Sequence, residues 1–212
     1  MLGSPADLFV VDPEGRGVGF DFVSQQVVNE IPSAVYSGQG TDPQVIWIQN
    51  NLLGEYDVYV IGTETGPYDL TIDFSEHGAS VDTQEITGET VEGAVYVYRL
   101  NIAEEEVTIN PDPAAELGRL EELIGGLPDD SFDKRKLASQ RKNALFNKID
   151  DVIWKVEAGN YTDAINKLFH DIRAKMDGDS TAEDWITDPE TQSSLCVIID
   201  HIISSIETLQ QE

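Results

Sequence analysis

The spacing of hydrophobic residues changes near the middle of the chain, at the segment PDPAAE that covers residues 111–116. Before this segment, short runs rich in valine, isoleucine and tyrosine alternate with turn residues: LFVVD, VGFDF, QVVNEI, QVIWIQN, EYDVYVIG, YDLTIDF and AVYVYRLNI. Clusters such as PEGRG and SGQGTDP separate them. Seven or more short strands with a turn about every ten residues are typical of a sandwich. The pattern therefore predicts an all-β antiparallel sandwich, Ig-like or jelly-roll-like, over residues 1–110.

After residue 116 the apolar positions recur every three to four residues, as on an amphipathic helix. The longest stripe consists of Leu195, Ile198, Ile199, Ile202, Ile203, Ile206 and Leu209. Other stripes are Leu117, Leu120, Leu123, Ile124 and Leu127; Leu145, Ile149, Val152, Ile153 and Val156; and Ile165, Leu168, Phe169, Ile172 and Met176. These stripes predict an all-α four-helix bundle over residues 117–212, joined to the sandwich by a semi-stiff linker over residues 111–116.

Capping residues mark several of the predicted helix ends. Gly159 can end the second helix in a left-handed conformation. Asp188 followed by Pro189 predicts the beginning of the last helix. Thr181 and Asp184 have the spacing of a capping box, which predicts a short helix around Trp185.

The chain is strongly acidic, with 40 acids against 13 bases and a net charge of −27. Residues 1–112 hold 20 of the acids but only two bases, Arg16 and Arg99. This balance excludes nucleic acid as a partner, because phosphate backbones are bound by clustered lysine and arginine. Five bases gather in KRKLASQRK, residues 134–142. We interpret this segment either as a solvated helix face or as a docking strip for the acidic domain.

The sequence predicts no transmembrane segment, because no apolar run approaches the ~18 residues that a spanning helix needs. Its beginning, MLGSPADLFVV, lacks the basic region and apolar core of a signal peptide. If the protein is exported, we therefore expect this chain to be a mature form or a fragment.

The stretch GEYDVYVIGTETGPYDLTID, residues 54–73, predicts two strands joined by a turn near Thr65. That register places Asp57 opposite Asp73 with Asp69 on the same face, and the apolar residues on the other face. Like charges opposite each other destabilise a sheet. Two interpretations stay open: a solvated acidic face, or a calcium ion held between the carboxylates.

A second acidic group surrounds the glycine-rich turn DPEGRGVGFD. It contains Asp12, Glu14 and Asp21, and the same two interpretations apply, a solvated surface or a calcium site. No other cofactor is indicated.

Catalytic motifs are missing from the sequence. It contains no HExxH, no GxSxG and no phosphate-binding loop. His170 and His201 stand beside Asp171 and Asp200, but adjacent residues on a helix point apart, so we interpret both histidines as solvated surface residues. The sequence therefore predicts a protein that is not an enzyme. A hydrolase that uses two of the many carboxylates stays as a weaker alternative.

Exposed aromatic side chains would favour carbohydrate binding. Tyr36, Tyr59 and Tyr96 are the candidates for such a row on the predicted sandwich. Trp154 lies beside the apolar stripe of its helix, where it can contact the sandwich, pack on Trp185, or offer a surface on which a sugar stacks.

Two resemblances cover most of the chain. GEYDVYVIGTETGPYDLTID and LFVVDPEGRGVGFD resemble the strand pair and the opening turn of small β-sandwich modules of secreted proteins, such as the bacterial pre-peptidase C-terminal domains. KLASQRKNALFNKIDDVIWKVEAGNYTDAINKLFHDIRAKMDG and DWITDPETQSSLCVIIDHII are similar to the FIMAH-like helical modules of large extracellular prokaryotic proteins. Many of those modules carry a cysteine pair. Here Asp179 and Pro189 lie near the corresponding places, and the single cysteine, Cys196, lies elsewhere.

The resemblance implies a non-catalytic accessory module pair, for which we expect a structural or adhesive role. The acidic groups described above add calcium as a further candidate ligand of the sandwich. It also implies a location outside the cell or on its surface. The expected partners are neighbouring domains of a larger surface protein or other surface proteins, with carbohydrate binding as the alternative. The resemblance supplies no catalytic residues.

Overall fold

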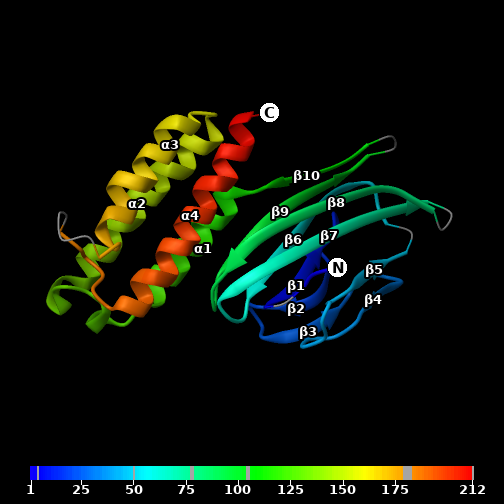
Figure 1. Ribbon diagram of the computed structural model, residues 1–212, viewed down its shortest axis with the longest axis horizontal. Helices are drawn as coiled ribbons and strands as arrows, with labels where there is room; N and C mark the ends of the chain where they lie inside the picture. Colours follow the sequence, from blue (N-terminus) through cyan, green and yellow to red (C-terminus); the bar gives the residue numbers. More distant parts are fainter. Residues whose placement is uncertain (4, 50, 77–78, 104–105, 179–182, 212) are drawn as a thin grey trace. The chain divides into compact units, whose positions relative to one another are not determined.

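The computed structural model of the chain describes residues 1–3, 5–49, 51–76, 79–103, 106–178 and 183–211. These residues form two compact units, Met1–Pro111 and Asp112–Glu212 (Figure 1). The first unit holds the strands and the second holds the helices. The predicted order, an antiparallel β region followed by four helices, is confirmed. No described helix is long and apolar enough to cross a membrane.

The structure differs from the prediction of a linker over residues 111–116. Strand β10 (Val107–Pro111) ends at Pro111, and helix α1 (Pro113–Gly126) begins two residues later. The Asp112 side chain accepts a hydrogen bond from the Ala115 N–H at 3.1 Å and so caps this helix. Proline suits the first helical turn, because its fixed φ is helical and its missing N–H would have no partner there. The segment that the prolines suggested as a connection therefore begins a helix.

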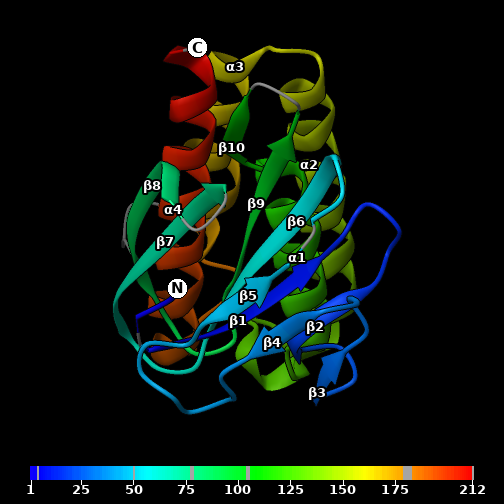
Figure 2. The same cartoon turned by 90° about the vertical axis from the view of Figure 1, so that its right-hand side faces the viewer.

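The β unit contains one six-stranded sheet and two strand pairs, and every pairing in them is antiparallel. The sheet has the order β10-β9-β6-β1-β2-β3. Its other strands are β9 (Val95–Ile102), β6 (Gly54–Gly62), β1 (Ala6–Val11), β2 (Gly17–Asp21) and β3 (Gln26–Asn29). The pairs are β4 (Ala34–Tyr36) with β5 (Ile46–Ile48), and β7 (Gly66–Glu76) with β8 (Ala79–Thr90). Figure 2 shows both pairs in front of the sheet.

The core of the β unit lies between one face of this sheet and the two strand pairs. Alternate residues of the strands point to this face, among them the buried Tyr56, Val58 and Val60 of β6 and Leu70 of β7. The prediction that these residues face the core is confirmed. Tyr68 of β7 stacks on Tyr96, with ring centroids 5.6 Å apart. Its hydroxyl lies 2.6 Å from that of Tyr98, and this buried hydrogen bond fixes β7 over β9.

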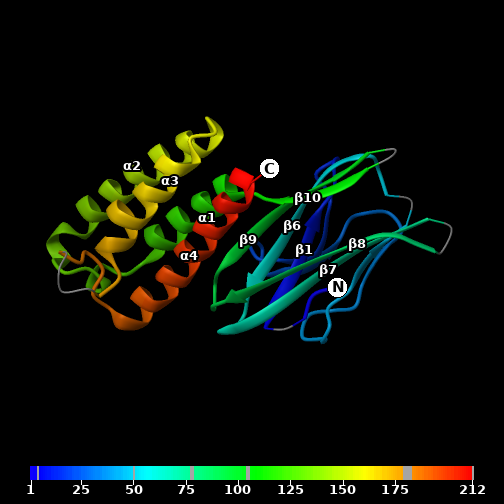
Figure 3. The same cartoon turned by 45° about the horizontal axis from the view of Figure 1, so that its top comes forward.

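The helical unit contains α1, α2 (Ala138–Glu157), α3 (Tyr161–Lys167) and α4 (Pro189–Gln211), which lie side by side (Figure 3). Short turns of 3-10 helix cover η1 (Asp129–Ser131), η2 (Arg135–Leu137) and η4 (Arg173–Lys175). The apolar stripes are largely buried. Gly159 has φ +72° after the end of α2, and Asp188 accepts the Thr191 N–H at 2.9 Å at the start of α4. Both predicted boundaries are confirmed.

The apolar stripe that begins in α3 is buried at a spacing of four residues: Ala164, Leu168, Ile172 and Met176. An α-helix repeats every 3.6 residues, so residues four apart are rotated by about 40° around the helix axis. The turn η3 (Leu168–Ile172) is a π-helix, whose wider turn reduces this drift. The prediction that Phe169 shares the buried stripe is wrong: its side chain is 49% exposed.

No helix forms around Trp185, so that prediction is also wrong; its capping residue Thr181 lies outside the described residues. Instead, the Trp185 N–H donates to the Lys175 carbonyl at 2.7 Å, and Ile186 forms a β-bridge with Phe132. The guanidinium of Arg141 lies 4.5 Å from the centre of the Trp185 ring. These contacts hold the segment in an extended form that local helix propensity does not predict.

We expect Gly19→Ala to lower the free energy of unfolding by more than about 3 kcal/mol. Gly19 has φ +115°, and a Cβ there would lie 2.2 Å from the Leu8 carbonyl oxygen of the neighbouring strand. Gly40→Ala is the matched control. It has φ +75° with nothing near the added atom, so it should cost only about 1 kcal/mol. Urea unfolding measures both, and equal losses would contradict this explanation.

Candidate functional site

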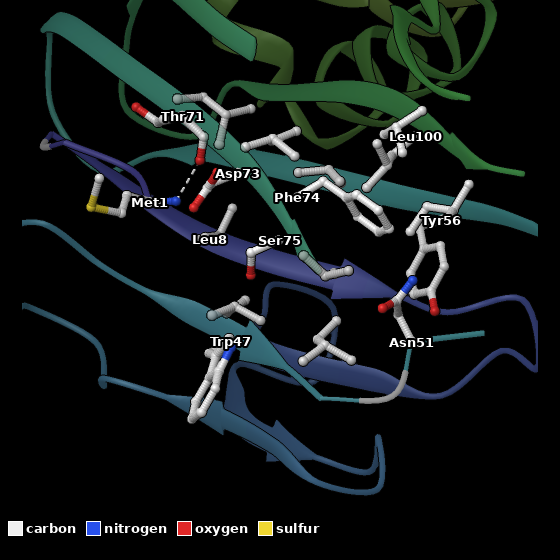
Figure 4. Close-up of a pocket in the computed structure, with 18 residues that line it drawn as sticks. Met1, Leu8, Trp47, Asn51, Tyr56, Thr71, Asp73, Phe74, Ser75 and Leu100 are labelled. Carbon is white, nitrogen blue, oxygen red and sulfur yellow. Dashed lines mark hydrogen bonds between the residues drawn. The ribbon is translucent and has the colours of Figure 1, made fainter. Parts of the chain in front are cut away.

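A cavity of about 160 Å³ opens in the β unit between β5 and β7 (Figure 4). Its floor is the apolar face of the sheet, and its walls are the two strands. The apolar lining consists of Leu8, Val10, Ile46, Ile48, Val58, Leu70, Ile72, Phe74, Leu100, Ile102 and Val107. Tyr56 and Asn51 lie together at one end. The cavity thus combines an apolar interior with a mouth that carries polar groups.

The cavity exists because the two strand pairs do not meet. Strand β7 pairs only with β8, and β5 pairs only with β4, among the strands that the structure describes. At one end of the gap, Leu2 lies between them and forms antiparallel bridges to Gln44 and to Leu70. Beyond Leu2 the floor is left open, and the cavity begins there.

A buried polar network holds the wall that contains β5. The Gln44 side-chain amide donates to Asp7 Oδ1 at 2.7 Å and to the Ala6 carbonyl at 3.0 Å. Its oxygen accepts the Leu8 N–H and the Tyr36 hydroxyl. Buried polar groups must be paired in this way, because each unpaired one would cost about 1–3 kcal/mol. The network therefore fixes residue 44, and with it the start of β5, against β1.

Polar groups line the mouth on the β7 side. Thr71, Asp73 and Ser75 lie at alternate positions along this strand (Figure 4). The amino group of Met1 donates to the Thr71 carbonyl at 2.6 Å. Burial lowers the pKa of this amino group, and the nearby Asp73 charge opposes the shift. Trp47 stands on the other wall with its ring turned away from the cavity, and it is 56% exposed.

The lining is poor in groups that carry out catalysis. The eighteen lining residues include one carboxylate, Asp73, and contain no histidine, cysteine, lysine or arginine. The arrangement can therefore hold an apolar group in its interior, with its polar and charged groups at the mouth.

The predicted register of the first acidic group is wrong. Strand β6 does not pair with β7; it pairs with β1 and β9. Asp57 stands opposite Val11 and Arg99, and the Arg99 guanidinium lies 3.6 Å from Asp57 and 3.1 Å from Glu55. A short turn between two strands suggested a hairpin, but the chain crosses here from the six-stranded sheet to a strand pair. This choice depends on contacts distant in sequence.

The other two aspartates of this group lie on β7. Asp69 is exposed, and its carbonyl accepts the Gly3 N–H at 2.8 Å. Asp73 stands opposite Thr83, whose hydroxyl donates to its carboxylate at 3.2 Å. Asp57 is therefore on a different strand pairing from Asp69 and Asp73. The structure does not bring the three carboxylates together.

The second acidic group is divided between the two ends of β2. Asp12 is buried, and it accepts the N–H groups of Glu14 and Arg16 at 2.9 Å and the Arg16 Nε at 2.7 Å. Arg16 also pairs with Glu14 at 2.7 Å. Asp21, at the far end of β2, accepts the Val23 N–H and the Ser24 hydroxyl. Arg16 thus occupies the position between Asp12 and Glu14 that the calcium hypothesis gives to a cation.

Burial alone would raise the pKa of Asp12. The hydrogen bonds from Arg16 and from the Glu14 N–H, together with the Arg16 charge, outweigh this effect and hold the pKa below its ordinary value. Among the described residues, no group of three or more histidine, cysteine or acidic side chains lies close enough to hold a metal ion.

The three candidate tyrosines do not form an exposed row. Tyr96 is fully buried in the core. Tyr59 packs with Phe9 and Phe22 on the opposite face of the sheet, with ring centroids 5.7 and 5.5 Å away. Tyr36 donates to Gln44, and burial together with the Asp7 charge raises its pKa to about 12. Alternation along a strand shows which residues share a face but not which face another layer covers. The prediction of one exposed row of tyrosines is therefore wrong.

The helical unit places its predicted residues differently as well. Trp154 is 60% exposed, with the Lys155 ammonium 5.7 Å from its ring. The interpretation of His201 as a solvated residue is wrong: its Nε2 lies 3.4 Å from the buried Glu116 carboxylate of α1. The sequence carries no signal for this pair, because the burial of Glu116 depends on how α1 and α4 pack.

Basic side chains of the segment 134–142 pair with acidic side chains and carbonyl groups of the helical unit. Lys134 lies 2.9 Å from Glu183, and Arg141 pairs with Asp133 and Glu183 at 3.0 and 3.2 Å. The Lys142 ammonium caps the end of α1 through the carbonyls of residues 125 and 127. The free thiol of Cys196 is half-buried, and burial raises its pKa, so it is poorly suited to nucleophilic chemistry.

No protein-family model matches the chain, and searches of curated proteins and of solved structures find no match either. The resemblance to pre-peptidase C-terminal and FIMAH-like modules therefore stays a prediction.

We expect Asp12→Asn to lower the free energy of unfolding at pH 6 but to lose this effect in acid. The folded pKa of Asp12 lies below its ordinary value of 3.8. Its stabilisation is therefore complete above about pH 5 and is lost as the pH falls through the folded pKa. Urea unfolding of both proteins between pH 2.5 and 6 measures the difference. A difference that stays constant over this range would contradict the assignment.

We also expect calcium, after chelation and at fixed ionic strength, to raise the thermal midpoint no more than sodium does. The candidate carboxylates do not converge, and Arg16 and Arg99 already neutralise part of their charge. Asp57→Asn and Asp73→Asn should leave the response unchanged. A calcium-specific rise that either substitution removes would restore the calcium interpretation.

Proposed function

We propose that this chain is a non-catalytic pair of accessory modules, a β-sandwich and a four-helix bundle, of an exported or cell-surface protein. Its role is structural or adhesive, and its partners are neighbouring domains or other surface proteins. The cavity between β5 and β7 carries the proposal, because its interior is apolar and Asp73 is the one carboxylate among its described lining residues. Such a lining favours a partner that buries apolar surface.

The use of the acidic residues supports the same role. The carboxylates that are buried in the described residues have structural partners: Asp12 pairs with Arg16, Asp7 with Gln39 and Gln44, and Glu116 with His201. A hydrolase would need two acids that face a shared cleft and differ in pKa. The other described acids are partly or fully exposed, and a high net surface charge keeps a module apart from other acidic surfaces.

Carbohydrate binding is a second candidate function, and the exposed ring of Trp47 beside the cavity favours it. Aromatic faces of this kind offer an apolar surface with a polar edge, on which a sugar ring can stack. The candidate lacks the expected row of tyrosines, so it depends on this tryptophan.

The test of the proposed function is a panel of chromogenic glycosides, esters and peptides incubated with the whole chain. We expect no turnover above the buffer rate. Turnover that persists after repurification and falls at least about tenfold in Asp73→Asn would overturn the non-catalytic assignment.

Affinity electrophoresis in gels that contain soluble polysaccharides tests the carbohydrate alternative. Retardation that Trp47→Ala removes and Trp154→Ala keeps would establish it. Both tryptophans are exposed, so the second variant controls for the loss of a surface indole. Unchanged mobility in every gel leaves the accessory role with protein partners.

A further inference from the structure

One end of the cavity already contains an extended piece of polypeptide. Leu2 exchanges two hydrogen bonds of 2.8 Å with Gln44. On its other side, the Met1 carbonyl accepts the Thr71 N–H and the Gly3 N–H donates to the Asp69 carbonyl, both at 2.8 Å. Residues 1–3 therefore form a short strand between the segment before β5 and strand β7, antiparallel to both.

The line of this strand leads into the cavity. Met1 lines the cavity, and the wall residues that follow are 71–75 on β7 and 46–48 on β5. We call this part of the cavity, bounded by β5, β7 and Met1, the strand slot. Neighbouring strands lie about 4.8 Å apart, so two strands that flank a third stand roughly 9.6 Å apart. The bridges of Leu2 to both sides show that the gap at this end has the width of one strand.

Backbone groups of β5 point into the strand slot. Ser37 donates to the Val45 carbonyl at 2.9 Å, and Val35 stands opposite Trp47, so the odd-numbered residues of this strand bond to β4. By alternation, the N–H and C=O groups of Ile46 and Ile48 face away from β4, on the side where Gln44 bonds to Leu2. No other described strand pairs with β5. An added strand would find a backbone ladder in the register that Gln44 begins.

The floor of the slot accepts apolar side chains. The Leu2 side chain is fully buried, whereas Met1 is 51% exposed, so alternate residues of this line point to the core and to solvent. The next inward position lies over the apolar floor, and the empty space of about 160 Å³ is of the size that holds one or two aliphatic side chains. An isolated small apolar ligand would fill this space but would leave the Ile46 and Ile48 backbone groups without a ladder.

We propose that the strand slot binds an extended segment of another protein, which adds a strand antiparallel to β5 and β7. The segment carries apolar residues at alternate positions that point to the floor. Its outward positions carry lysine or arginine, because the unit around them has 20 acids and only two arginines within residues 1–112, and Asp73 lies at the rim. This inference deepens the proposed accessory role and rests on it, since it names the kind of partner.

Tethered extensions test the slot itself in the full chain. One variant carries Lys-Val-Lys-Val directly before Met1, which places valine at the inward positions. Its matched control carries Val-Lys-Val-Lys, with the same composition shifted by one residue. We expect the first extension to slow amide hydrogen exchange at Ile46 and Ile48 by at least about tenfold and to raise the thermal midpoint. The control extension should do neither.

A free peptide tests whether another chain can supply the strand. Acetyl-Lys-Val-Lys-Val-Lys-Val-amide is added to the unextended protein at millimolar concentration, and exchange at Ile46 and Ile48 is measured again. We expect protection that a scrambled peptide with adjacent valines does not give. Leu100→Trp places a larger side chain on the floor and should reduce this protection, with folding verified by the Tyr68 and Tyr98 amide exchange of the core.

Equal effects of the two tethered extensions would contradict the proposal that the slot binds an added strand in this register. Protection by the tethered extension without protection by the free peptide would overturn a strand supplied by another protein. Toluene that stabilises the protein while both peptides fail would instead assign the cavity to small apolar ligands. If the slot binds no strand, the result of the substrate panel is unchanged. A failure of this inference is therefore distinguishable from a failure of the non-catalytic role, which would appear as turnover.

Discussion

The apolar face of the six-stranded sheet has to be covered, and the rest of the β unit follows from the way this is done. A sheet with one apolar face is stable only when another layer removes that face from water. The hairpin β7–β8 covers one part, with Tyr68 stacked on Tyr96 and hydrogen-bonded to Tyr98. The pair β4–β5 covers another, held through Gln44. Because the two pairs remain separate, the cover is incomplete, and the candidate site is the part of the face left between them.

The same constraint explains where polar groups are allowed. Close to the covered face, the buried side chain of Gln44 has partners for both its nitrogen and its oxygen, in Asp7, Ala6 and Tyr36. The carboxylate of Asp12 is buried at a turn because Arg16 returns to it from four residues later. Among the described residues, only Asp7, Asp12 and Glu116 are buried acids, and each of them has a partner. A net charge of −27 is therefore compatible with a fold whose interior is conventional.

The helical unit depends on the fit between apolar spacing and helix pitch. Where the apolar residues recur every three and four positions, as in α4, a regular helix buries them. Where they recur every four, the helix passes into the π-turn η3 and keeps Leu168 and Ile172 buried. The ion pairs of Arg141 and Lys134 with Glu183 then hold the segment before α4 in place. Local spacing decides the helices, and long-range contacts decide the connections.

Three features could be predicted from the sequence: the division into β and helical parts, most of the residues that face each core, and the helix boundaries at Gly159 and Asp188. These features depend on local periodicity, backbone conformation and capping, which neighbouring residues encode. Only the tertiary structure decided which strands pair, so it separated Asp57 from Asp73, buried Tyr96 and brought His201 to Glu116. It also decided the strand slot, because a cavity between β5 and β7 depends on how segments distant in sequence are spaced. Alternation tells which residues share a face, but the partner of that face is set by the free energy of the whole packed unit.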